Sequence, residues 1–375
     1  MRLLTALLAA VALALAAAAG AGAAPVAAVQ DDQLPNFTGA DLERRLDLLA
    51  ESGADVARVD VLWSQVAPRR PSNAENPNDA AYDWGRYDQI VRGLAARGII
   101  PLFDYYDTPR WAARGGNGST APRAADAGRF AGAMALRYSG RWPDPQGGLL
   151  PEVRFIEVWN EPNITRFLSP QCTPRRGGRA PYVAPRLYAA MLAAAYRRIK
   201  RANPRAVVIA GVAGPAGSTP RFCPESGAST GVIEFINGLA KERPPFDAWS
   251  QHAYPIGSPK QAVFLPSWNT LPRIQRAVDR IRRVPIYVTE TGYHTSYNRF
   301  HRYFVSEEQQ AAWLDETFEA AETRPRVELV TWFNLQDNPS WTGGLIRGDG
   351  TRKPSWDRFV SASARYPAPP AWSAP

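Results

Sequence analysis

Two acidic residues in this chain each follow an apolar run at the point where the run stops. Glu161 lies in the stretch "FIEVWNEPN" (155–163), and Glu290 ends the run "PIYVTE" (285–290). A carboxylate in such a place is either a solvated loop charge or a reactive group. Two carboxylates that face each other across a cleft have one familiar use, which is cleavage of a glycosidic bond. One must donate a proton while the other stays ionised, so their surroundings must push the two pKa values apart.

The elements that must position this pair alternate along the chain. Eight apolar or β-branched runs are expected to form strands: 25–30, 55–62, 99–105, 153–159, 206–211, 246–253, 285–290 and 328–334. Between them, apolar residues spaced three and four apart predict helices, and Ser306 followed by Gln309 predicts a capping box. Eight buried strands alternating with helices favour a closed (β/α)8 TIM barrel. A doubly wound open sheet is the alternative, disfavoured because no glycine-rich phosphate turn follows the first strand.

Long loops follow most of these strands. The 375 residues exceed the roughly 250 of a plain barrel, and the surplus lies mainly in the segments 63–81, 105–125, 160–184, 212–230, 253–270, 291–305 and 335–355. All of these loops gather at the carboxyl face of a barrel, where they build a cleft. Glu161 and Glu290 belong to this face, where inward-pointing residues are typically catalytic.

The two ends of the chain differ from the middle. The segment "MRLLTALLAAVALALAAAAGAGAA" carries one positive charge at Arg2, an apolar run and then small residues. This pattern predicts a signal peptide over residues 1–23 and hence a secreted protein; an uncleaved membrane anchor is the alternative. The catalytic barrel domain is expected over 25–360, followed by a Pro/Ala-rich, poorly ordered tail over 361–375. No other stretch is apolar and long enough to cross a membrane.

Charge and cysteine content limit the partners. The formal net charge is +9, but the basic residues are scattered, and no nucleic-acid-binding motif is present, so no nucleic-acid partner is expected. Cys172 and Cys223 form a disulfide in an oxidising compartment or remain two free thiols. They are too few for a zinc site, and without a histidine cluster neither a metal nor another cofactor is expected. The oligomeric state is left open.

The two motifs around the glutamates resemble those of a known group of enzymes. "EVWNEPN" and "TETG" are similar to the motifs of clan A glycoside hydrolases, the cellulase-like superfamily that includes families 5 and 39, and the resemblance covers the whole barrel. It implies that Glu161 is the acid/base, that Glu290 is the nucleophile of a retaining reaction, and that Asn160 binds the sugar 2-hydroxyl.

The same resemblance assigns supporting residues to other strand ends. Arg58 in "VARVDVLW" would hold the nucleophile ionised, or else form an ion pair with the deeper Glu157. His252 and Tyr254 in "SQHAYP" match a His-x-Tyr pair whose tyrosine contacts the nucleophile, and Trp332 in "VTWFN" matches the floor of the sugar subsite. One departure lies on the third strand, where family 5 enzymes often place a histidine and this chain has the residues Asp104, Tyr105, Tyr106 and Asp107.

Aromatic residues follow several strands on the expected active face, where each would act as a sugar platform or as loop packing: Trp63, Tyr105, Tyr106, Trp111, Tyr293 and Trp341. The function expected from these patterns is a secreted, cofactor-independent retaining glycosidase whose partner is a β-linked oligo- or polysaccharide. The alternatives are a transglycosylase on the same barrel, or a catalytically silent carbohydrate-binding protein of the cell surface. The sugar, and endo or exo action, are not specified.

Overall fold

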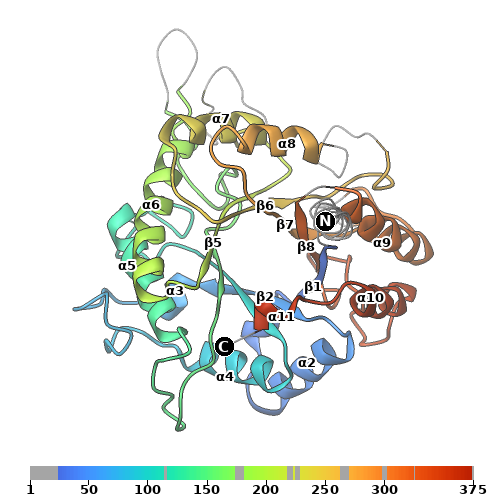
Figure 1. Cartoon of the computed structure of the whole chain (residues 1–375), viewed down its shortest axis with the longest axis horizontal. Helices are drawn as coiled ribbons and strands as arrows, with labels where there is room; N and C mark the ends of the chain where they lie inside the picture. Colours follow the sequence, from blue (N-terminus) through green and yellow to red (C-terminus); the bar gives the residue numbers. More distant parts are fainter. Residues whose placement is uncertain are drawn as a thin grey trace, which may run out of the picture.

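A computed structural model of the chain contains eight parallel strands that close into a barrel in the order β1 to β8. The structure describes residues 24–373 except 114–115, 174–180, 218–222, 224–228, 262–269, 298–301 and 325. Figure 1 looks along the barrel and shows the helices as a ring outside the strands. The expected (β/α)8 TIM barrel is therefore confirmed, whereas the expected signal segment, residues 1–23, lies outside the described residues.

The strands begin and end within two residues of the expected runs. They are β1 (Val26–Gln30), β2 (Val56–Leu62), β3 (Ile100–Tyr106), β4 (Phe155–Val158), β5 (Val207–Ala213), β6 (Ala248–His252), β7 (Ile286–Thr291) and β8 (Val327–Phe333). All five residues of β1 and all six of β7 are buried. Parallel strands are covered on both faces, which explains why their sequences are almost continuously apolar.

The helices of the outer ring are α2 (Gly39–Glu51), α4 (Gly85–Ala96), α5 (Ala124–Arg137), α6 (Ala184–Ala202), α7 (Val232–Glu242), α8 (Leu271–Val278), α9 (Glu307–Glu322) and α10 (Pro354–Arg365). Shorter helical turns are η1 (Leu34–Asn36), α3 (Trp63–Val66) and α11 (Pro370–Ser373). Ser306 caps α9 by accepting a hydrogen bond of 3.1 Å from the Gln309 N–H, as the capping box predicts. Among the described residues no helix combines the length and apolar character that crossing a bilayer requires.

The inside of the barrel changes character along its length. Near the strand starts, the side chains facing the lumen form an apolar cluster of Val26, Ala28, Val56, Ile100, Leu102, Phe155, Ile209, Ala248, Tyr287 and Leu329. Because successive strand residues face opposite sides, positions two residues further along each strand point into the next layer of the lumen. There the layer contains Gln30, Arg58, Asp104 and Glu157, all buried. The polar groups thus lie toward the carboxyl ends of the strands.

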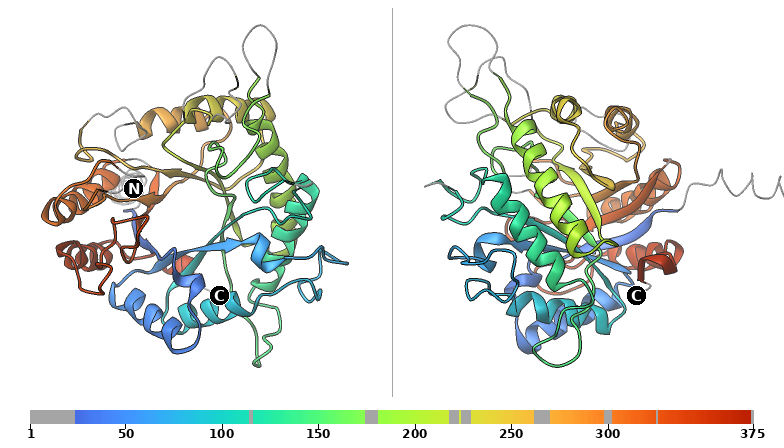
Figure 2. Two further views of the ribbon diagram at one scale, coloured as in Figure 1. Left: turned by 180° about the vertical axis from the view of Figure 1, so that it is seen from behind. Right: turned by 60° about the vertical axis from the view of Figure 1, so that its left-hand side comes forward.

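Residues 361–373 of the Pro/Ala-rich tail are folded, contrary to the expected disorder. Residues 361–365 continue α10, and α11 places Trp372 against Phe155 and Tyr287, with ring centroids 4.7 and 5.9 Å apart. Figure 1 shows α11 inside the ring of helices, next to β2 and close to the C-terminal end of the chain, which Figure 2 shows from two further sides. The tail covers the apolar end of the barrel, and burying an aromatic ring there offsets the low structural propensity of its sequence.

Candidate active site

Glu290 faces the lumen because β7 contains a bulge. On β6 the register advances by two residues, from Ser250 to His252, while on β7 it advances by three, from Tyr287 to Glu290. The ladder with β8 shows the same extra residue in β7 between Val288 and Thr291. Regular alternation would give Tyr287 and Glu290 opposite directions. The bulge re-aims the Glu290 carboxylate across the barrel toward Arg58 on β2, where the two side chains lie 2.8 Å apart.

Glu161 lies just beyond β4 in an unusual backbone conformation. Its φ is 38°, and that of Trp159 is 74°, both in the left-handed region that residues with a Cβ rarely adopt. The Glu161 N–H donates to the carbonyl of Val212 at 2.9 Å, which ties this turn to β5. Backbone strain of this kind persists where the surrounding structure holds it and is concentrated at functional sites.

Arg58 is the centre of the polar layer. Its guanidinium donates from Nε to Glu157 at 2.6 Å, from Nη1 to Glu290 at 2.8 Å and from Nη2 to Asp104 at 2.8 Å. Burial opposes its charge most strongly, but Glu157, Asp104 and Glu290 outweigh burial and raise the pKa of Arg58 well above its ordinary value. Both expected contacts are present, because Arg58 pairs with the deeper Glu157 and with Glu290. Nη2 also donates to Asn160 Oδ1 at 3.2 Å.

His252 lies between the two glutamates. Its Nδ1 is 2.9 Å from Glu161 Oε1 and 3.2 Å from Glu290 Oε2, and the ring is fully buried. Burial, the largest influence, favours the neutral ring, but Glu290 and Glu161 outweigh burial and raise the pKa of His252. With a proton on Nδ1 it donates to a glutamate; without one it accepts from a protonated Glu161. His252 is thus a direct partner of both carboxyl groups.

Tyr254 fixes the second oxygen of Glu290. Its hydroxyl donates to Glu290 Oε2 at 2.7 Å, and burial, followed by the charge of Glu290, raises the pKa of Tyr254 well above its ordinary value. The hydroxyl therefore keeps its proton and remains a donor. Trp341 packs edge-on against the Tyr254 ring at 5.0 Å, and Phe333 packs against Trp341 at 4.7 Å. Of the expected aromatic residues, Trp341 therefore packs against the tyrosine that is hydrogen-bonded to Glu290.

Trp332 does not occupy the expected position. It is completely buried in the outer core between strands and helices, and its Nε1 donates to the carbonyl of Gly343 at 3.1 Å. Leu329 faces the lumen, so alternation along β8 directs Trp332 outward. The expectation that this ring forms the floor of the sugar subsite is therefore wrong for this structure.

Asp60 is a polar residue of the site that was not anticipated. It follows Arg58 by two positions on β2, so strand alternation directs both side chains into the lumen, and its Oδ1 lies 3.7 Å from Arg58 Nη1. Tyr106, one of several candidate platforms, donates through its hydroxyl to Asp60 Oδ2 at 3.2 Å. The period-two spacing after Arg58 was a usable signal, but single charges on strand ends are usually solvated.

The two glutamates and His252 also form a group that could hold a metal ion. One ligand atom from each of Glu161, His252 and Glu290 lies within 4.8 Å of the others. The expectation of no metal came from the absence of a histidine cluster in sequence, and such a mixed group can only be recognised in three dimensions.

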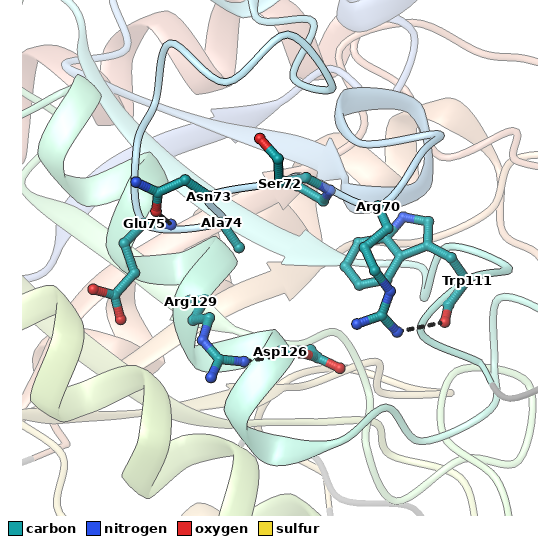
Figure 3. Close-up of a pocket in the computed structure, with 9 residues that line it drawn as sticks. Arg70, Ser72, Asn73, Ala74, Glu75, Trp111, Asp126 and Arg129 are labelled. Atoms are coloured by element: carbon teal, nitrogen blue, oxygen red, sulfur yellow. Dashed lines mark hydrogen bonds and ion pairs between the residues drawn. The ribbon is translucent and has the colours of Figure 1, made fainter.

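A separate cavity of about 430 Å³ lies to the side of this site. It is formed by the loop after β2, by Trp111 and by the start of α5, and contains neither glutamate: its lining is Arg70, Pro71, Ser72, Asn73, Ala74, Glu75, Trp111, Asp126 and Arg129. Figure 3 shows Arg70 beside the ring of Trp111, with the guanidinium 4.8 Å from the ring centroid. Trp111 is therefore covered by Arg70 and lies apart from the catalytic groups.

Cys172 and Cys223 form a disulfide, with their Cα atoms 5.7 Å apart. They connect the loop after β4 with the loop after β5, and β4 and β5 are neighbouring strands of the barrel. The loop after β4 carries Glu161, so the cross-link braces the segment that presents this carboxylate.

Comparisons with known proteins agree with this architecture. No protein-family model and no curated protein matches the sequence. Among solved structures, a family 39 glycoside hydrolase from the gut symbiont Bacteroides cellulosilyticus WH2 superposes with a TM-score of 0.59 and 21% identity, over 91% of this chain and 64% of that chain. A monomeric beta-xylosidase from Caulobacter crescentus CB15 superposes with a TM-score of 0.59 and 20% identity, over 92% of this chain and 69% of that chain.

A third structure, GH5_18 from Streptomyces cattleya in complex with GlcNAc, superposes with a TM-score of 0.61 and 18% identity, over 93% of this chain and 82% of that chain. The chain spans about two thirds of the length of the first two of these proteins. At such identities the likeness concerns the fold. The chain therefore shares its (β/α)8 barrel with clan A glycoside hydrolases of families 39 and 5.

Proposed function

We propose that the protein is a retaining glycoside hydrolase that cleaves β-linked oligo- or polysaccharides. The observation that carries this proposal is the approach of two carboxylates: an oxygen of Glu161 and an oxygen of Glu290 lie within 4.8 Å of each other. Retaining enzymes hold these groups about 5–5.5 Å apart, whereas inverting enzymes leave about 6.5–9.5 Å for a water molecule. This close approach of two carboxylate oxygens is compatible with the retaining arrangement and supports direct attack by one carboxylate.

In the first step Glu290 attacks the anomeric carbon while Glu161 donates its proton to the leaving oxygen. The bond from the anomeric carbon to the leaving oxygen breaks, and an ester between the sugar and Glu290 forms. Arg58 and Tyr254 each donate to one oxygen of Glu290, at 2.8 and 2.7 Å. These donors fix the orientation of the carboxylate before the attack.

In the second step Glu161 removes a proton from a water molecule, which attacks the same carbon and releases Glu290. After the first step Glu161 is a carboxylate, and the His252 Nδ1, at 2.9 Å, can then donate to it. After the second step Glu161 is protonated again, and the Nδ1–H of His252 then donates to the released Glu290 carboxylate at 3.2 Å. His252 thereby keeps its proton on Nδ1 and donates to whichever of the two glutamates is ionised.

Export of the protein is part of the same proposal. The signal pattern of residues 1–23 motivates it, and the disulfide between Cys172 and Cys223 supports it, because disulfides persist mainly in oxidising compartments. Detection of the mature chain in the culture medium, beginning near residue 24, tests this point. Retention of the full-length chain inside the cell would contradict it.

The function is tested by a hydrolysis screen with the protein lacking residues 1–23. β-Xylosides, β-glucosides, β-mannosides and β-N-acetylglucosaminides come first, since the structural neighbours include a beta-xylosidase and a protein with bound GlcNAc. For any substrate cleaved, NMR of the first product should show the β-anomer, which demonstrates retention. Products longer than the substrate would indicate transglycosylation. Binding without turnover across the panel would overturn the enzymatic proposal.

A further inference from the structure

The carboxyl groups around Arg58 are of two kinds. The side chains of Asp104 and Glu157 are completely buried, whereas that of Asp60 is 15% exposed, close to the 16% of Glu161 and the 11% of Glu290. The first two belong to the packed layer below the site. Asp60 shares the partial exposure of the two glutamates, so a ligand can reach its carboxylate as well.

Asp60 also lies close to the reacting centre. The same atom, Arg58 Nη1, is 2.8 Å from Glu290 Oε1 and 3.7 Å from Asp60 Oδ1. Both carboxylates therefore lie beside the same nitrogen atom of Arg58. A sugar ring whose anomeric carbon lay at Glu290, the glycone, would place its hydroxyl groups near Asp60.

The protein leaves part of the bonding capacity of Asp60 unused. Gln30 Nε2 donates to Oδ1 and the Tyr106 hydroxyl donates to Oδ2, both at 3.2 Å, and the distance to Arg58 is near the limit of an ion pair. A carboxylate has about four acceptor sites, so two remain for a ligand. Asp32, which follows β1, accepts more hydrogen bonds from the protein than Asp60 does, because the side-chain amides of Gln33, Asn334 and Asn338 all donate to it.

We propose that Asp60 is a specificity-determining residue that accepts a hydrogen bond from a glycone hydroxyl other than the 2-hydroxyl. This inference rests on the proposed function. The site accordingly takes uncharged β-glycosides. The Asp60 carboxylate accepts a hydrogen bond from a hydroxyl group and repels the carboxylate of a uronic acid at the same place. Burial, reinforced by the charge of Glu290 and only partly offset by Arg58, raises the pKa of Asp60 to about 7, so a donor that approaches it relieves an unfavourable charge.

The test is a double-mutant cycle between residue 60 and the sugar. kcat/KM is measured at pH 8, above the pKa of Asp60, for the wild type, Asp60→Asn and Asp60→Ala, on the best aryl β-glycoside and on its 3-deoxy and 4-deoxy analogues. Loss of one hydrogen bond to a charged acceptor should lower kcat/KM roughly 10- to 100-fold, whether the hydroxyl or Asp60 is removed. Once one of them is absent, removing the other should cost little, and this coupling should appear with one deoxy sugar only.

Additive losses, or equal coupling with both deoxy sugars, would overturn the proposal. Asp60→Asn keeps the shape of the side chain, so this variant is expected to fold. Its thermal midpoint of unfolding checks that it does. Asp41→Asn makes the same chemical change on exposed α2 and should leave kcat/KM unchanged. Asp60→Asn should also narrow the preference for a β-glucoside over the matching β-glucuronide. If the wild type cleaves no glycoside, the proposed function fails first; if it does and the cycle shows no coupling, only the role of Asp60 fails.

Discussion

The two ends of the barrel are built from the same eight strands and have opposite chemistry. At the amino end the lumen is filled by aliphatic and aromatic side chains and is covered by Trp372. At the carboxyl end it contains a buried arginine surrounded by carboxyl groups, a bulged strand and a residue with positive φ. Apolar packing adds stability wherever it occurs, whereas buried charges tend to cost stability. The comparison indicates that one end maintains the fold and the other maintains reactivity.

Replacement of the presumed nucleophile should give the largest effect on the reactive end. Glu290→Ala removes the group that forms the covalent intermediate, so kcat should fall by several orders of magnitude while the thermal midpoint changes little. Added azide should restore turnover and give a product of inverted configuration, which NMR detects. Near-normal turnover without azide would show that Glu290 is not the nucleophile.

Arg58→Met tests whether the carboxyl end also depends on its charge balance. The change leaves Glu157 and Asp104 buried without their cation, so the free energy of unfolding should fall by about 3–5 kcal/mol. Urea unfolding measures this loss. Adding Glu157→Gln and Asp104→Asn should recover stability but not activity, because Glu290 still lacks the hydrogen bond from Arg58. Recovery of both would mean that Arg58 has no role in the reaction.

Trp372→Ala addresses the amino end. The ring contacts Phe155 and Tyr287 and is only partly exposed, so its loss should lower stability by about 1–3 kcal/mol and leave kcat/KM unchanged at 25 °C. Trp341→Ala is the matched control at the carboxyl end, where it packs against Tyr254. It should reduce kcat/KM instead. If both variants changed stability and kcat/KM in the same way, the two ends of the barrel would not have the separate roles inferred for them.

The smallest effect concerns stability and pH at Asp60. Burial raises its pKa from the ordinary 3.8 to about 7. The protonated carboxyl therefore contributes stability below pH 4, and this contribution is lost as the pH rises through 7. Asp60→Asn should accordingly raise the thermal midpoint relative to the wild type at pH 8 more than at pH 4. An equal difference at both pH values would show that Asp60 does not titrate as inferred.

The sequence predicted the strands well because their boundaries depend on local information. Apolar runs of parallel strands are nearly continuous, so the boundaries of β1 to β8 follow from composition. The predictions for Trp332 and for the tail were wrong for a different reason. The direction of Trp332 depends on strand alternation, and the order of residues 361–373 depends on Trp372 finding an apolar surface made by distant strands.

What the sequence alone determined is therefore the barrel and the two acidic residues at the ends of its strands. Only the tertiary structure decided which side chains meet: the extra residue in β7 turns Glu290 inward, His252 comes to lie between both glutamates, and Asp60 joins them. A one-residue change of register reverses the direction of a side chain while leaving its sequence pattern almost unaltered. For that physical reason the geometry of the site becomes visible only once the strands are paired.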